Sequence, residues 1–215
     1  MFWKKKGPEV YEADEIVRVE KHIATHFGAY GKVFHELVSP DIHIDIACIP
    51  PSEDKDFYTL ITIGMGAHRM NVPKELRGQG WSRAELLITL PPEWKVESGE
   101  EVWYWPIRQL KTLARMPKYQ RTWFCGGHTV SNQKPFTKST SLSGILLIPS
   151  LVFGEESVAC EMPEGDPVRF YHLIPLYEEE IRLKLKKDVD ALLDILPEDF
   201  EHVVDIHRKN YAKLD

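Results

Sequence analysis

The best candidate for nucleophilic chemistry in this sequence is a cysteine followed three residues later by a histidine. Cys125 and His128 are separated by two glycines. A glycine turn can aim backbone N–H groups at an oxyanion, and a neighbouring histidine can activate a thiol. The thiolate would need a lowered pKa, which depends on the surroundings of the thiol and not on the spacing. The pattern leaves a small Cys/His-dependent hydrolase or transferase as an alternative function.

Three pairs of residues have a spacing that would let two side chains share a metal ion. His22 and His26 lie one helical turn apart, and His43 and Asp45 share a face of a predicted strand. Cys125 and its histidine form the third pair. Each pair is half of a zinc site, because zinc takes three or four protein ligands and no further ligand can be named. We therefore expect no metal ion.

Signatures of nucleotide binding and of serine nucleophiles are absent. The glycine pairs at 64/66 and 78/80 lack the third glycine of a dinucleotide-binding loop, and no phosphate-binding loop with lysine occurs. No Gly-x-Ser-x-Gly elbow is present either. With no complete catalytic constellation, we predict a protein that is not an enzyme and that uses no cofactor.

Aromatic residues are concentrated between the predicted sheet and the second predicted helix. Trp94, Trp103, Tyr104 and Trp105 form a dense cluster. Such residues pack cores, and they are also enriched at binding hot spots. Both interpretations remain open at this point, since Trp103 and Trp105 alternate with Tyr104 and one side of the segment could be exposed.

Hydrophobic spacing predicts helices at both ends of the chain and strands in between. Strands cluster and helices cluster without regular alternation, which favours an α+β fold over a doubly wound one. We predict a single domain over 1–215, with its core at about 9–196, in which helices flank a mixed or antiparallel sheet. The predicted helices are 9–27, from Trp105 until Pro117, 175–195 and about 199–211; the predicted strands are 32–38, 41–46, 57–63, 84–90, 144–148 and 168–174.

Composition limits the classes of partner. The 215 residues carry a net charge of −6, which argues against a nucleic-acid or anionic-membrane partner. No apolar window approaches the length of a transmembrane helix. Three widely spaced cysteines suit reduced thiols better than a disulfide framework, so we expect a cytoplasmic protein.

Many segments, taken together and in order, resemble the Suppressor of fused (SUFU) family, in particular its bacterial members. They cover most of the chain, and the set is specific although no single piece is. The segments are VFHELVS (33–39), HID (43–45), YTLITIGMG (58–66), MNVP (70–73), AEL (84–86), LPPEW (90–94), WPIRQLK (105–111), LAR (113–115), TW (122–123), GHT (127–129), LSGILL (142–147) and FYHLIPLYEEE (170–180).

The resemblance implies a compact α+β domain equivalent to the N-terminal domain of the animal protein. That protein restrains the zinc-finger transcription factors of Hedgehog signalling by clamping a short peptide as an added β-strand. Bacterial relatives are thought to serve in part as immunity proteins of polymorphic toxin systems, and no enzymatic activity belongs to the family. This chain departs from the family pattern at Gly66-Ala67, Gly127 and Asn132, so we carry over no individual contact residue.

We therefore predict a protein-binding module with an immunity or regulatory role. Its partner would be another protein or peptide, such as a toxin domain, with no nucleic acid and no membrane; the sequence does not predict an oligomeric state. Binding would use a sheet edge and the loops at 64–81 and 126–143. Four large polar or aromatic residues on these loops are the candidate contacts: His68, Arg69, Trp81 and His128.

Overall fold

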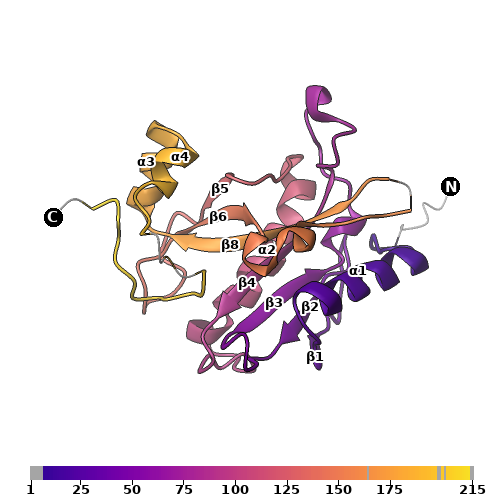
Figure 1. Ribbon diagram of the computed structural model, residues 1–215, viewed down its shortest axis with the longest axis horizontal. Coiled ribbons are helices and arrows are strands. Elements are labelled where there is room, and N and C mark those ends of the chain that lie inside the picture. The colour runs from indigo at the N-terminus through magenta and orange to yellow at the C-terminus, as the bar shows by residue number, and fades with distance from the viewer. Residues whose placement is uncertain (1–6, 164, 198–199, 201, 214–215) are drawn as a thin grey trace.

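A single mixed β-sheet forms the centre of the protein (Figure 1). The computed structural model describes residues 7–163, 165–197, 200 and 202–213. The strands within them are β1 (Lys32–Phe34), β2 (Asp45–Ile49), β3 (Tyr58–Ile63), β4 (Arg83–Leu90), β5 (Thr129–Ser131), β6 (Gly144–Pro149), β7 (Ala159–Cys160) and β8 (Val168–Leu176). Their order is β1-β2-β3-β4-β8-β6-β5, with β7 paired to β8 beside this path. The pair β4–β8 is parallel and the other pairs are antiparallel, so the predicted α+β fold with a mixed sheet is confirmed.

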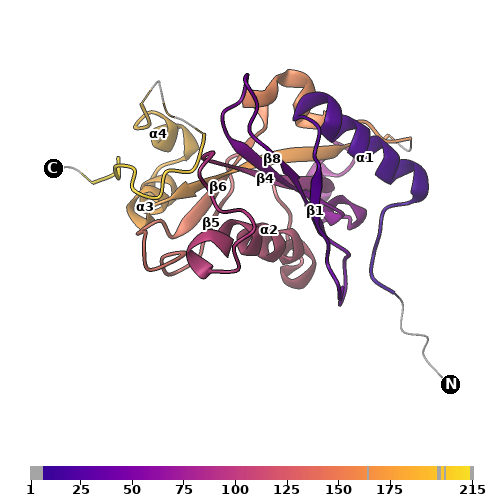
Figure 2. The ribbon, with the colours of Figure 1, turned by 90° about the horizontal axis from the view of Figure 1, so that it is seen from below.

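Helices cover both faces of the sheet. Figure 2 shows α1 (Ala13–His26) on one side and α2 (Glu101–Gln120) on the other. Ile23 of α1 packs in one core cluster with Phe170 of β8, whereas Trp105 of α2 belongs to the cluster on the opposite face. The central strand β4 is buried along its whole length, because both of its faces are covered. No helix in the described part of the chain is long and apolar enough to cross a membrane.

The tryptophan cluster lies largely inside the core on the α2 side. Trp94 and Trp105 are buried, and the Trp105 ring stacks on Phe136 with centroids 4.6 Å apart. The indole of Trp94 donates to the carbonyl oxygen of Trp103 at 2.9 Å. Core packing is therefore the main role of these aromatic residues.

The strand predicted at 41–46 buries the side chains that the alternation predicts, but its predicted bounds are wrong. Ile42, Ile44 and Ile46 are all buried in the α2-side core, as their alternation predicts. Ile42, however, bridges Glu9, and regular pairing begins only at β2. The preceding strand β1 is also shorter than predicted, because the N–H of Glu36 leaves the ladder and donates to the Asp45 carboxylate at 2.8 Å.

The predicted limits of the second helix are wrong at both ends. Pro106 and Pro117 lie inside α2 and are buried, whereas the sequence predicts them at its start and stop. A proline removes one helical hydrogen bond, and burial of this helix face offsets that loss. The helix ends at Gln120, and the following residue, Arg121, adopts a left-handed conformation with φ of 50°.

The helix predicted at 175–195 is two helices, α3 (Glu178–Lys186) and α4 (Val189–Leu193). Its first residues belong instead to β8, where the carbonyl of Leu176 accepts from Ser143 at 2.8 Å. Asp188 separates the helices and caps α4, since its side chain accepts from the Ala191 N–H at 2.8 Å.

The C-terminal helix predicted at about 199–211 is also wrong. Residues 199 and 201 lie outside the described residues, and 202–213 contain turns and an isolated bridge between Val203 and Thr89. The pairing of β4 with β8 ends at the Leu87–His172 pair, so the Thr89 carbonyl is left to accept from the Val204 N–H at 3.0 Å. The described residues 202–213, which we call the C-terminal strap, therefore contact the end of β4 through Val203 and Val204.

Candidate functional site

The outer edge of β5 presents backbone hydrogen-bonding groups that the sheet does not use. The backbone N–H of Asn132 donates to the Ser143 carbonyl at 2.7 Å, and the backbone N–H of Leu147 donates to the His128 carbonyl at 2.9 Å. Hydrogen-bonded pairs recur every second residue in an antiparallel ladder. The N–H and C=O groups of Thr129 and Ser131 therefore point away from β6, and no backbone partner for them lies among the described residues.

A groove of about 290 Å³ lies between this edge and α2, and we call it the α2–β5 groove. Its floor is apolar, with Leu113 and Ile145 buried in the core. Gln109 donates to the Asn132 side chain at 3.4 Å across one end, and Tyr119 is 64% exposed at the other. The lining residues are uncharged: Gln109, Thr112, Leu113, Met116, Tyr119, Gln120, Val130, Ser131, Asn132 and Ile145.

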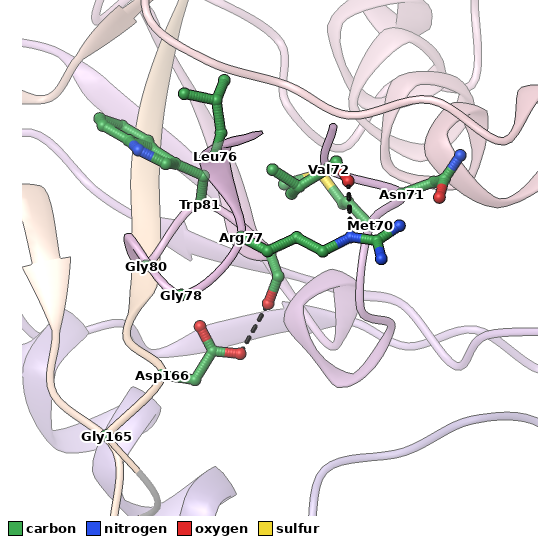
Figure 3. Close-up of a pocket in the computed structure, with 11 residues that line it drawn as sticks. Met70, Asn71, Val72, Leu76, Arg77, Gly78, Gly80, Trp81, Gly165 and Asp166 are labelled. Atoms are coloured by element: carbon green, nitrogen blue, oxygen red, sulfur yellow. Dashed lines mark hydrogen bonds between the residues drawn. The ribbon is translucent and has the colours of Figure 1, made fainter. Parts of the chain in front are cut away.

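A second concave site lies in the loop between β3 and β4 and is called the Trp81 pocket (Figure 3). It has a volume of about 510 Å³. Met70 and Val72 are buried beneath it, and Figure 3 shows Trp81 and Arg77 on its walls with Asp166 below them. The lining residues are Met70, Asn71, Val72, Leu76, Arg77, Gly78, Gly80, Trp81, Ser82, Gly165 and Asp166.

The structure brings two of the four candidate contacts to this pocket. Trp81 lines it, and Arg69 forms an ion pair with its Asp166. The Trp81 ring also packs beneath the guanidinium of Arg169, 4.2 Å from the ring centroid. His68 is engaged elsewhere, since its Nδ1 lies 2.7 Å from a carboxylate oxygen of Glu9.

His128 lies away from these three residues, at the start of β5. Its ring meets Trp123 edge-on, with centroids 4.9 Å apart. Partial burial, and secondarily the charge of Lys184, lower the pKa of His128 below its usual value. Of the four candidates, Trp81 lines a concave site and Arg69 pairs with a residue that lines it, whereas His68 and His128 line neither the Trp81 pocket nor the α2–β5 groove.

Cys125 does not have the surroundings of an activated nucleophile. Burial raises the pKa of its thiol, although the Gly126 N–H and Arg169 act in the opposite direction. Its backbone carbonyl accepts from the His128 N–H at 3.1 Å, but no hydrogen bond joins the thiol to the imidazole in the described structure. The geometry gives no support to the Cys/His enzyme alternative.

The predicted half-sites for metal remain half-sites. The rings of His22 and His26 share a face with centroids 4.5 Å apart, but His22 Nε2 lies 3.1 Å from the Ser157 carbonyl. Asp45 lies between His43 and His35. Its Oδ1 is 3.2 Å from His43 Nε2, and its Oδ2 is 2.8 Å from His35 Nδ1. No group of three or more possible ligands in the described residues is arranged to hold a metal ion.

The most deeply buried carboxylate serves the fold. Glu85 has no exposed surface and accepts from the Tyr11 and Thr62 hydroxyls, each at 2.5 Å. It also accepts from the N–H groups of Gly64 and Gly66 at 2.9 and 3.1 Å. Burial raises the pKa of Glu85 against the effect of these donors. The network ties β3, β4 and the loop after β3 together.

Sequence reasoning missed the groups that shape the two concave sites. Leu113, which the sequence analysis names only within the segment LAR (113–115), forms part of the groove floor. Arg77 and Asp166 come together from positions 89 residues apart, so local spacing carries no signal for them. The turn-forming Gly78, Gly80 and Gly165 were the available signal, because they mark the exposed loops that form the Trp81 pocket.

Comparison with known proteins agrees with this architecture. The Suppressor of fused protein (SUFU) family model matches residues 40–209. An uncharacterized protein of Ureaplasma parvum serovar 3, UU111, is 24% identical over 206 residues, covering 94% of this chain and 98% of the relative.

Solved structures show the same fold. A SUFU homologue from Neisseria gonorrhoeae has a TM-score of 0.67 at 20% identity, with 95% of this chain and all of the other covered. The Sufu–Fu complex structure gives 0.64 at 15% identity, covering 95% and 93% of the two chains. Suppressor of Fused from Drosophila gives 0.57 at 16%, and this chain (91% covered) spans 48% of its length. The chain belongs to the Suppressor of fused family.

Proposed function

We propose that this chain is a protein-binding module without catalytic activity, and that it binds an extended partner segment along the outer edge of β5. The observation that carries the proposal is the pair of residues Thr129 and Ser131, whose outward N–H and C=O groups lie beside the apolar α2–β5 groove. A strand added there would gain main-chain hydrogen bonds from the edge and side-chain contacts from the groove. Each such bond is worth about 0.5–1.5 kcal/mol net.

The opposite edge of the sheet is a poorer acceptor. Lys32 on β1 forms an ion pair with Glu97 at 2.5 Å, and charged residues on an edge discourage strand addition. β5 has the sequence Thr-Val-Ser and no charge. The pairing chemistry therefore favours β5.

A family relative supports the general role. The solved Sufu–Fu complex is, by its description, a protein of this fold in a complex. For this chain we propose a polypeptide partner contacted by the groove and the neighbouring loops, with Trp81, Arg69, His68 and His128 as flanking contacts. The finer role suggested by the bacterial family, an immunity protein that neutralises a toxin domain in the cytoplasm, agrees with three unpaired cysteines. A regulatory partner would use the same surface.

Site-specific photocrosslinking in the native host tests the binding surface. A photoreactive amino acid replaces Tyr119, which is exposed at the groove, or Val17, which is exposed on α1 as a control. We expect a polypeptide crosslinked from position 119 and not from position 17.

The variant Thr129→Pro removes an outward N–H without touching the bonds to β6, and Thr129→Val keeps that N–H. Because the partner carbonyl left without a donor costs about 1–3 kcal/mol, we expect Thr129→Pro to weaken binding of the captured partner at least about fivefold, and Thr129→Val to leave it within twofold. Equal affinities of the two variants would refute binding at this edge. Co-expression with a neighbouring toxin gene tests the immunity role separately: survival would support it, and unchanged toxicity would count against it.

A further inference from the structure

The Trp81 pocket has a rigid frame and an apolar floor. The Met70 N–H donates to the Ser82 carbonyl at 2.7 Å, and the Asn71 N–H donates to Thr122 at 3.1 Å. These bonds fix both ends of the loop that forms the wall. Met70 and Val72 are buried at the floor, and the Trp81 ring stands beside it in Figure 3.

One cation at this pocket is held in place and pairs with no carboxylate among the described residues. Arg77 donates from Nε to the Val72 carbonyl at 3.2 Å, which directs its guanidinium over the floor in Figure 3. No carboxylate of the described residues forms an ion pair with it. The carboxylate of Asp166 is already engaged, since it accepts from Ser82 at 2.6 Å and from Arg69. The charge of Arg77 is therefore uncompensated.

One further arginine without a described carboxylate partner lies beside the pocket. Arg169 stacks on the Trp81 ring and donates to the Gly80 carbonyl at 2.9 Å. With Arg77 and Arg169 at the pocket and Asp166 already paired with Arg69, the pocket complements an acidic ligand.

We propose that the Trp81 pocket is a second docking point that binds an acidic side chain next to an apolar one in a partner polypeptide. The carboxylate pairs with the free Nη groups of Arg77, for which a guanidinium fork is suited. The apolar neighbour packs on Met70 and Val72 against the Trp81 ring. A polyanion such as a nucleic acid suits the site less, because Asp166 stands on one wall and the chain as a whole is acidic.

The test uses a blocked ten-residue peptide in which aspartate and glutamate alternate with leucine, and its analogue with asparagine and glutamine in place of the acids. Binding is followed through the indole N–H resonance of Trp81 by NMR. We expect the acidic peptide to shift this resonance and the amide analogue to bind at least tenfold more weakly.

Matched variants isolate the arginine. Arg77→Gln is expected to weaken the acidic peptide at least tenfold, whereas Lys74→Gln, an exposed cation of the same loop that does not line the pocket, leaves it within twofold. Arg77→Glu should reverse the preference and bind a lysine–leucine peptide. Equal binding of the acid and amide peptides, no effect of Arg77→Gln, or a stronger shift with a short DNA duplex would each overturn the proposal. Thr129→Pro leaves peptide binding here unchanged, so failure at one site is distinct from failure at the other.

Discussion

His172 of β8 is fully buried beside the docked C-terminal strap, and its protonation should weaken the fold as pH falls. The hydroxyl of Thr89 donates to the His202 carbonyl at 2.6 Å, so His172 Nε2 must donate to that hydroxyl, 3.0 Å away. The Nδ1 atom then has no proton and no partner among the described residues. Burial, and secondarily the neighbouring His202, lower the pKa of His172 from 6.5 to about 3.

The sign and size of the effect follow from this shift. Between pH 6.5 and about 3, the pKa values of His172 in the unfolded and folded chains, the unfolded chain binds a proton at His172 and the folded chain does not. Each pH unit in that window costs about 1.4 kcal/mol, so at pH 4.5 this one group lowers the free energy of unfolding by roughly 2–3 kcal/mol. Above pH 6.5 the penalty is absent.

The assay compares urea denaturation of the wild type and His172→Gln between pH 7.5 and 4.5. Glutamine keeps an N–H donor for Thr89 but does not titrate. We expect the difference in unfolding free energy between the two proteins to move by about 2–3 kcal/mol in favour of the variant as pH falls. His207→Gln, at an exposed position, is the matched control. A difference that stays constant over this range would refute the assignment of His172 as a buried neutral imidazole.

Three further predictions concern the fold and the cysteine alternative. Arg208 holds the fully buried Glu180 through two bonds of 2.7 and 2.5 Å, so Arg208→Ala should cost about 3–5 kcal/mol in urea denaturation, and a loss below 1 kcal/mol would contradict its structural role. Tyr11→Phe removes one donor to Glu85 and should cost about 1.5–3 kcal/mol, whereas Tyr30→Phe, at a half-buried site outside this network, should cost less. Cys125 should react with iodoacetamide in the folded protein at least about tenfold more slowly than free glutathione, because burial raises its thiol pKa; a faster reaction would revive the enzyme alternative.

The major elements of the fold could be predicted from local patterns. The strands around 57–63 and 84–90 are close to β3 and β4 because β-branched runs end there at glycine or proline. The family could also be recognised from segments spread along the chain. The strand predictions depend on signals that lie within a few neighbouring residues, whereas the family is recognised from the whole set of segments.

Errors occurred where tertiary contacts override those signals. Pro106 and Pro117 indicate helix ends locally, but burial keeps them inside α2. The sequence predicts a helix at about 199–211, but Val204 and Ile206 pack toward the core from the C-terminal strap. The strap is held there because the Thr89 carbonyl at the end of β4 accepts from the Val204 N–H. Spacing along the chain cannot show which strand edges remain open.

The type of residue at the candidate site could be predicted from the sequence, but the residues that surround it could not. Trp81 was chosen as a large aromatic residue on a loop, and it does line a pocket. The presence of Arg77 and Asp166 in the same pocket could not be predicted from sequence, since the two residues line it only after the sheet forms. The α2–β5 groove likewise depends on the position of α2 across the sheet.

Amide hydrogen exchange at β5, with and without the captured partner, tests the central claim most directly. The outward N–H groups of Thr129 and Ser131 have no backbone partner in the described structure, and strand addition would give them one. We expect the partner to slow exchange at both amides at least about tenfold, while the Val130 amide, which points toward β6, changes much less. Unchanged exchange at Thr129 and Ser131 in a saturated complex would contradict binding at this sheet edge.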